Sequence, residues 1–158
     1  MKKDFENIIG EKIQKVIYTE LNHPKGKFYF DDFDTFDTSI NIQMQNNIWW
    51  HLSWKDDEFF EFGKGKYLKN KNYQDSEIKS WDATERWKSI LNEKIIDFKV
   101  QYFDGSRIFI EKITINFENK ISKNILILEE LNLEESIPKS TKFDICGEIY
   151  VFHSDKLL

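Results

Sequence analysis

The chain has 158 residues, of which 40% are apolar, 16% aromatic and 32% charged, and its formal net charge is −5. This composition lies far from that of disordered proteins, and a chain of this length buries most of its surface around a core. Acidic and basic residues are interspersed, which argues against nucleic acid as a partner, because no basic stripe is available to neutralise phosphates. We therefore expect residues 1–158 to form a single compact domain.

Hydropathy and cysteine content predict a cytoplasmic protein with no membrane partner. No apolar run of roughly 7 to 15 residues follows Lys2 and Lys3, as a secretory signal requires. No segment approaches the roughly 18 apolar residues of a membrane helix. The single cysteine, Cys146, lies in a strand-like tract and cannot form an internal disulfide, so we expect a small buried residue there.

The first half of the chain shows the two-residue period of half-buried strands. Residues 13–18 predict a first strand, and residues 39–45 a second strand with alternating apolar side chains on a buried face. Asn46-Asn47 is a turn signal, because Asn tolerates the left-handed backbone of tight hairpins, and residues 48–54 return as the partner strand. Residues 64–75, rich in Lys, Asn and Gly, predict an exposed loop.

The period changes in the middle of the chain. Apolar residues recur at three- and four-residue spacing over residues 80–91, which predicts a short helix at about residues 81–91. The hairpin pattern then returns over residues 112–118, with a turn near Asn119-Lys120 and a partner strand over residues 124–129. We expect the helix to pack as a lid or bridge between two sheets.

A weak internal repeat divides the chain into two related halves, about residues 5–70 and 88–158. Three stretches match in the same order: residues 9–18 with 91–100, residues 40–46 with 113–119, and residues 58–66 with 148–156. We therefore predict a mainly β fold in which two pseudo-repeated antiparallel strand units pack as a sandwich or partly closed barrel, with one central helix.

Histidine and cysteine are too scattered to predict a transition-metal site. The four residues show none of the zinc-ligand spacings and occupy positions far apart in the sequence: His23, His51, Cys146 and His153. We expect no metal, no cofactor and no set of catalytic residues. A reactive Cys146 with His153 as its base is the alternative to a buried cysteine and a surface histidine.

Four aspartates alternate with phenylalanines near residue 33: Asp31, Asp32, Asp34 and Asp37 lie among Phe30, Phe33 and Phe36. A calcium loop needs Gly at its sixth position and Glu at its twelfth, but counting from Asp32 these positions hold Asp37 and Gln43. The pattern instead predicts a short solvated loop or turn that its phenylalanines attach to the core.

The candidate binding residues come from a tryptophan-rich strand and from acidic positions. On the strand over residues 48–54, Trp50, Leu52 and Trp54 share one face, whereas Trp49, His51 and Ser53 share the other. The repeat would place Glu58 and Glu148 at equivalent positions. The predicted binding residues are therefore Trp49, His51, Asp56, Asp57, Glu58, Glu61 and Glu148. The alternative is that both faces are covered, one by the opposite sheet and one by the helix over residues 81–91.

For function, the sequence favours a small non-enzymatic, bacterial-type protein-interaction role, with toxin neutralisation by an immunity protein as the most concrete version. Its acidic residues would then face a basic protein partner such as a toxin. The alternative is a small-ligand or carbohydrate-binding module that uses the tryptophan strand. A second alternative is a hydrolase based on the carboxylates of Glu58, Glu148 or Asp57. The sequence predicts no oligomeric state.

Overall fold

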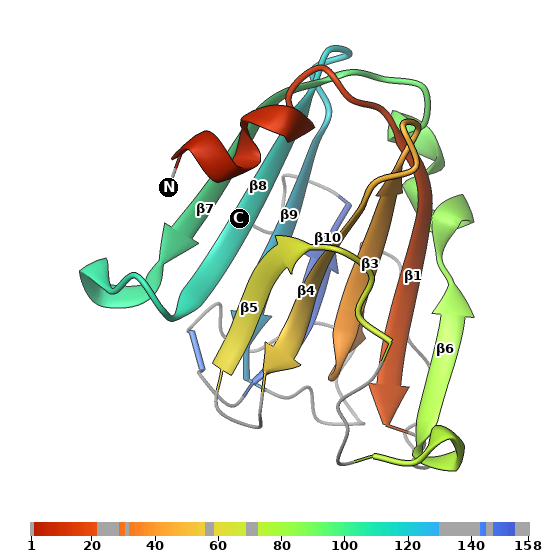
Figure 1. The fold of residues 1–158 in the computed structure, drawn as a ribbon, viewed down its shortest axis with the longest axis vertical. Helices are drawn as coiled ribbons and strands as arrows, with labels where there is room; N and C mark the ends of the chain where they lie inside the picture. Colours follow the sequence, from red (N-terminus) through yellow and green to blue (C-terminus); the bar gives the residue numbers. More distant parts are fainter. Residues whose placement is uncertain are drawn as a thin grey trace.

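The computed structural model describes residues 2–21, 29–30, 32–55, 59–68, 73–129, 143–144 and 147–153. These residues form two antiparallel sheets of five strands each, which face one another across a shared core (Figure 1). The two sheets do not close into a barrel. The mainly β fold predicted from the sequence is confirmed, and of the two packing arrangements the sandwich is the one observed.

The strands of the first sheet are, from edge to edge, β5 (Phe59–Lys64), β4 (Trp49–Lys55), β3 (Ser39–Met44), β1 (Ile13–Leu21) and β6 (Ile78–Asp82). Those of the second sheet are β2 (Phe33–Phe36), β10 (Glu148–Phe152), β9 (Ser122–Leu128), β8 (Ile110–Phe117) and β7 (Ile95–Tyr102). The helical segments are short 3₁₀ helices: η1 (Lys2–Ile8), η2 (Asp75–Glu77), η3 (Thr84–Ile90) and η4 (Phe103–Gly105).

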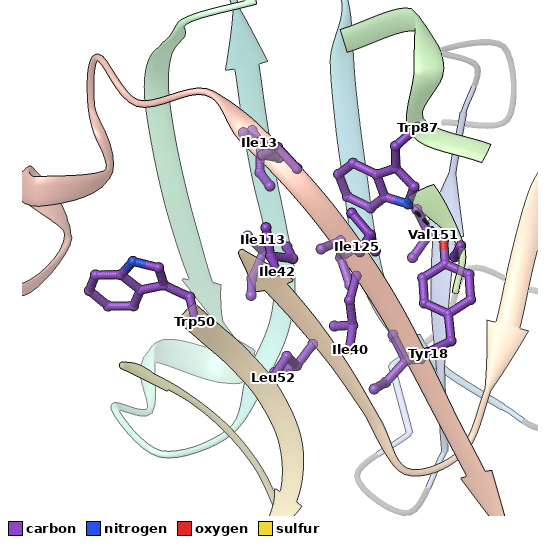
Figure 2. Packing of buried hydrophobic residues seen from close by; sticks show 14 of the residues in the cluster. Ile13, Tyr18, Ile40, Ile42, Trp50, Leu52, Trp87, Ile113, Ile125 and Val151 are labelled. Atoms are coloured by element: carbon purple, nitrogen blue, oxygen red, sulfur yellow. Dashed lines mark hydrogen bonds between the residues drawn. The ribbon is translucent and has the colours of Figure 1, made fainter. Parts of the chain in front are cut away.

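The core forms because alternate side chains of both sheets point inward (Figure 2). Ile40, Ile42 and Met44, the face predicted to be buried, are at most 2% exposed, which confirms the predicted alternation on β3. Ile113 and Ile125 meet them from the second sheet. Burial of each of these side chains contributes about 1.5–3 kcal/mol to folding.

The two halves form strand units with the same order. In the first sheet β1, β3, β4 and β5 are consecutive neighbours, and in the second sheet β7, β8, β9 and β10 follow in the same way. Pairing in both units is irregular at equivalent places, between Ile13 and Lys15 and between Ile95 and Asp97. The pseudo-repeat of strand units is therefore confirmed, whereas the exact limits of the halves stay a prediction.

The two predicted hairpin turns share a backbone conformation. Asn47 and Lys120 both adopt left-handed backbone, with φ of 70° and 69°. In each turn the preceding asparagine, Asn46 or Asn119, accepts a backbone hydrogen bond from the residue two positions on, at 3.0 and 3.1 Å. These contacts are Asx turns, and they explain why asparagine ends both apolar runs.

Equivalent residues also meet where the units join. Lys12 and Lys94 form an isolated antiparallel bridge. Beside it, the Gly10 N–H donates to the Ile95 carbonyl at 2.8 Å, and the Ile95 N–H donates to the Glu11 carbonyl at 2.9 Å. Pairing of a residue with its own counterpart indicates a pseudo-two-fold axis near this bridge.

The third sequence match is wrong by one residue. Trp54 pairs with Phe60 in the first sheet, and its counterpart Ile127 pairs with Ile149 in the second. Phe60 is therefore the counterpart of Ile149, and Phe59 that of Glu148. A shift of one residue moves a side chain to the other face of a sheet, so Glu148 has no equivalent glutamate.

The predicted central helix is observed as the 3₁₀ helix η3, which packs against β1. Its Trp87 and Ile90 are buried. The Asp82 carboxylate at its start accepts hydrogen bonds from the backbone and hydroxyl of Thr84, at 3.0 and 2.6 Å, and these bonds lower the pKa of Asp82. The helix lies along the side of the first sheet rather than over its outer face (Figure 1).

Candidate functional site

A cavity of about 200 Å³ lies at the end of the sandwich where β1 ends and β10 begins. Strand ends and connections from both sheets supply its walls, which bring together two carboxylates and three aromatic rings. We call it the acidic cavity, and its lining residues are Leu21, Asp37, Thr38, Trp54, Tyr67, Tyr73, Gly147 and Glu148.

The two carboxylates of the acidic cavity are held by the backbone and by hydroxyls. Glu148 is 5% exposed, and its Oε2 accepts a hydrogen bond from the Thr35 hydroxyl at 3.0 Å. Asp37 Oδ1 accepts hydrogen bonds from the Leu21 N–H and the Thr38 hydroxyl, both at 2.9 Å. A Cβ on Gly147 would clash with the Leu128 carbonyl oxygen, so only glycine fits directly before Glu148. These contacts fix where both carboxylates lie.

Trp54 and Tyr67 supply aromatic surface from opposite faces of the first sheet. Trp54 packs against the core, and its ring forms an edge-to-face contact with Phe60 in which the centroids lie 4.8 Å apart. The inward face predicted for Trp50, Leu52 and Trp54 is thereby confirmed. Tyr67 belongs instead to a segment that crosses the outer face of the sheet.

This segment, residues 65–68, is called the strap. Its Tyr67 N–H donates to Asn41 Oδ1 at 2.7 Å, and the Asn41 Nδ2 donates back to the Tyr67 carbonyl at 3.0 Å. The Tyr67 ring stacks on His51 with centroids 5.8 Å apart. The Lys66 ammonium lies 4.7 Å above the Trp49 ring, a cation–π contact. Among the described residues, the strap rather than the helix predicted at 81–91 contacts this outer face.

His51 is half-buried beneath the strap. Its Nδ1 lies 2.9 Å from the Ser53 hydroxyl, and burial lowers its pKa, an effect that the nearby Glu61 carboxylate partly offsets. Desolvation disfavours the charged imidazolium, so His51 is neutral near pH 7.

The structure divides the predicted binding residues between two neighbouring places. Trp49, His51 and Glu61 lie on or beside the outer face under the strap, and Glu148 lies in the acidic cavity. Residues 56–58, with the predicted Asp56, Asp57 and Glu58, lie outside the described residues, as do His23, Asp31 and Cys146. Tyr67 contacts both places, and no sequence signal marked it, because its role depends on the path of the strap.

A second polar cluster, the Asp34 network, is buried between η3 and the second sheet. Asp34 is fully buried in β2, and its carboxylate accepts hydrogen bonds from Tyr18 and Arg86, contacts His153 and forms an ion pair with Arg86. The Tyr18 hydroxyl and His153 Nε2 each lie 2.6 Å from Oδ2, and Arg86 Nε and Nη2 lie 2.9 and 2.8 Å from Oδ1. Lys123 Nζ contacts His153 Nδ1 at 2.9 Å.

The Asp34 network corrects two expectations from the sequence. The segment around Asp34 is a buried strand and not a solvated turn, because Arg86, the buried Tyr18 and the largely buried His153 satisfy its carboxylate. His153 is not a surface histidine, since its side chain is 13% exposed and contacts both Asp34 and Lys123. These partners come from distant parts of the sequence.

Burial shifts the pKa values of two groups in the Asp34 network, Tyr18 and Lys123. Desolvation, reinforced by the Asp34 charge, raises the pKa of Tyr18 well above its usual value, so its hydroxyl stays protonated and donates. Desolvation lowers the pKa of Lys123 to about 8, although Asp34 opposes this shift. His153 Nε2 faces the Asp34 carboxylate, which accepts hydrogen bonds, and Nδ1 faces the Lys123 ammonium, which donates them, so these contacts match the tautomer with its proton on Nε2.

The order Asp34, His153, Lys123 resembles an acid, base and nucleophile chain, but it is closed to substrate. Lys123 is 1% exposed, and its Nζ lies 5.7 Å from the centre of the buried Trp87 ring. The Trp87 indole N–H donates to the Tyr18 hydroxyl at 2.8 Å (Figure 2). We interpret this network as a structural connection between η3, β1 and the second sheet.

A second cavity, of about 300 Å³, occupies the equivalent end of the second half and is called the apolar cavity. Its lining residues are Phe103, Asp104, Ser106, Phe109 and Phe143. Phe103, directly after β7, is the counterpart of Leu21, the last residue of β1. Phe109 contacts Phe59 of the other sheet, with ring centroids 6.2 Å apart. The two cavities thus differ in chemistry at related places.

The described residues bring together no cluster of three or more His, Cys, Asp or Glu side chains suited to a metal ion. None of the helical segments in these described ranges has the length and apolar character of a membrane span.

Comparison with known proteins found no matching family model, no matching curated protein and no matching solved structure.

Proposed function

We propose that this protein is a non-enzymatic binding protein that recognises a basic protein partner by accepting a lysine or arginine side chain in the acidic cavity. The convergence of two carboxylates with three aromatic rings supports this proposal. Carboxylates form charge-assisted hydrogen bonds with ammonium and guanidinium groups, and aromatic faces attract cations. The net charge of −5 would speed encounter with a basic partner.

The size of the acidic cavity favours a side chain over a whole small molecule. Its volume of about 200 Å³ is below the roughly 300–1,000 Å³ of pockets that enclose drug-sized ligands. A protruding lysine or arginine needs less space, and the rest of its protein would contact the surrounding surface.

Neutralisation of a basic toxin is the concrete version of this proposal, and it implies a cytoplasmic immunity protein. Asp56, Asp57 and Glu58 follow β4 directly in the sequence, two residues beyond Trp54 of the acidic cavity. They would add negative charge to the same interaction.

N-acetyl-arginine amide is a suitable probe, and its neutral isostere N-acetyl-citrulline amide is the matched ligand control. By calorimetry or NMR titration we expect the arginine probe to bind with a dissociation constant of about 1 mM, as one anchored side chain allows. Glu148→Gln should weaken binding about tenfold. The control Glu85→Gln should leave it unchanged, because that side chain is 87% exposed on η3. Equal binding of both probes, or an unaffected Glu148→Gln variant, would refute the proposal.

A carbohydrate ligand is the second candidate, because rings and carboxylates also suit a sugar. Trp54 and the two tyrosines present faces for C–H stacking, and Glu148 and Asp37 accept hydrogen bonds from hydroxyls. Glucose and N-acetylglucosamine distinguish the two candidates. Saturable binding of either sugar that persists in 0.5 M salt, without binding of the arginine probe, would favour the carbohydrate module.

A further inference from the structure

We propose that Asn41 and His51 are positioning residues of the acidic cavity, and that the strap couples ligand binding there to the protonation state of His51. This inference rests on the proposed function, because Tyr67 is the strap residue that lines the cavity. Neither Asn41 nor His51 lines it, so both act through Tyr67.

The Asn41 side chain forms hydrogen bonds with the backbone of the strap, as the backbone of a neighbouring strand would. Its side chain is buried, with the residue 1% exposed, and its amide exchanges two hydrogen bonds with the backbone of Tyr67, at 2.7 and 3.0 Å. Both bonds fix the backbone from which the Tyr67 ring enters the cavity. Removing the amide would leave the Tyr67 N–H and carbonyl without this partner and would release the ring.

The His51 ring lies beneath the Tyr67 ring and stacks on it. The two rings are inclined by 23° with centroids 5.8 Å apart. A Cβ on Gly63 of the adjacent strand would lie 3.4 Å from His51 Nε2, so the glycine leaves just enough room for the imidazole. The imidazole is therefore confined between β5 and the strap.

The charged and polar groups around His51 come from each neighbouring element. Ser53 on β4 contacts its Nδ1, and the carboxylate of Glu61 on β5 acts on its charge. On β3 the neighbour is Asn41, opposite His51 in the pairing register. On the strap the Lys66 ammonium lies over Trp49, on the same face of β4.

The sign of the coupling follows from burial. With the strap in place, desolvation lowers the pKa of His51, so the closed strap binds fewer protons than an open strap that admits water. Acidification through the titration of His51 therefore favours the open strap. Because an open strap withdraws Tyr67, cation affinity in the acidic cavity falls as the pH falls.

At the equivalent positions of the second half, the two side chains make different contacts. Thr114 and Asn124 are the counterparts of Asn41 and His51, and there the Thr114 hydroxyl donates to Asn124 Oδ1 at 3.1 Å. The two side chains satisfy each other across the strands, whereas Asn41 and His51 both turn their polar or aromatic surface to the strap. The strap contacts are thus a property of these residues and not of the sheet.

Two measurements on the full chain test the inference. The first needs no ligand: hydrogen exchange of the Tyr67 amide by NMR, corrected for the intrinsic rate, between pH 7.5 and 5.5. We expect protection to fall about fivefold on acidification in the wild type, and not in His51→Phe, which keeps the stack without titrating. Asn41→Leu should lower protection about tenfold at pH 7.5, whereas the control Gln43→Ala, on the same face of β3, should not. Protection that falls equally in wild type and His51→Phe would overturn the inference.

The second measurement is the affinity of N-acetyl-arginine amide over the same pH range, since its guanidinium does not titrate there. We expect wild-type affinity to fall about fivefold and His51→Phe affinity to stay constant over this pH range. Constant wild-type affinity would overturn the inference while leaving the proposed function intact. No binding at any pH, with the exchange result as expected, would refute the cation site and show that the strap responds to His51 alone.

Discussion

Two equivalent regions of the sandwich are stabilised in opposite ways. In the first half, Phe5 of η1 packs on Trp50 of β4 with ring centroids 6.3 Å apart. At the same positions of the second half, Trp87 of η3 faces Lys123 of β9, whose Nζ lies 5.7 Å from the ring centre. The first region continues as an aromatic cluster with Phe62. The second continues as the Asp34 network.

The comparison shows that the same strand arrangement accommodates either an aromatic cluster or a buried ionic network at this position. Aromatic rings contribute through area and edge contacts that are insensitive to pH. A buried ionic network contributes only while all its members are satisfied, because each unpaired charge is costly away from water. We therefore expect the two regions to respond differently to substitution and to pH.

The largest expected effect comes from Asp34→Asn. The change would leave the buried Lys123 and the partly exposed Arg86 without the negative charge of the Asp34 carboxylate, which costs about 3–5 kcal/mol of unfolding free energy. Urea denaturation measures this loss. The control is Asp97→Asn, whose side chain is 41% exposed beside Lys99 and should cost less than about 1 kcal/mol. A loss at Asp34 as small as that of the control would show that the network does not hold η3 to the second sheet.

The next effect is the dependence of stability on pH. The folded pKa of Lys123, about 8, lies below its unfolded value of 10.5, so between these pH values the unfolded chain binds more protons. Unfolding free energy should therefore rise by about 2–3 kcal/mol from pH 8 to 10.5. Lys123→Met should remove this rise, and a parallel rise in the variant would assign it to other groups. Thermal denaturation at a series of pH values provides the data.

The smallest effect concerns the backbone at equivalent turns. Gly10 and Asn92 both have left-handed backbone, with φ of 87° and 68°. Gly10→Ala should cost about 1 kcal/mol, from backbone strain alone, since a Cβ there meets nothing within 4 Å. Gly10→Asn should cost less, because asparagine tolerates this conformation. Equal losses for alanine and asparagine would argue that Gly10 is required for another reason.

The sequence could predict what depends on local pattern. The strands, the hairpins and the repeat were predicted from the alternation over residues 39–45 and from the turns at Asn46 and Asn119. These features depend only on residues that are close together in the sequence. The third match failed by one residue, since alternating strands resemble one another in either register. Whether the two halves share an ancestor stays a prediction.

The sites could not be predicted because they join distant residues. The Asp34 network connects residues up to 119 positions apart, and no local pattern distinguishes the buried Asp34 from its neighbours. Glu148 was identified from the wrong equivalence, although it does line the acidic cavity. His51 was chosen for its face of the strand, and that face proved to carry the strap.

The central claim is that a cationic side chain binds the acidic cavity and not its apolar counterpart. Assigned NMR spectra of the full chain, recorded while N-acetyl-arginine amide is added, test it most directly. We predict saturable shifts of the Trp54 indole and Tyr67 amide signals, with Phe103 and Phe109 unchanged. Shifts confined to Phe103 and Phe109, or no saturable shift at Trp54, would contradict the account.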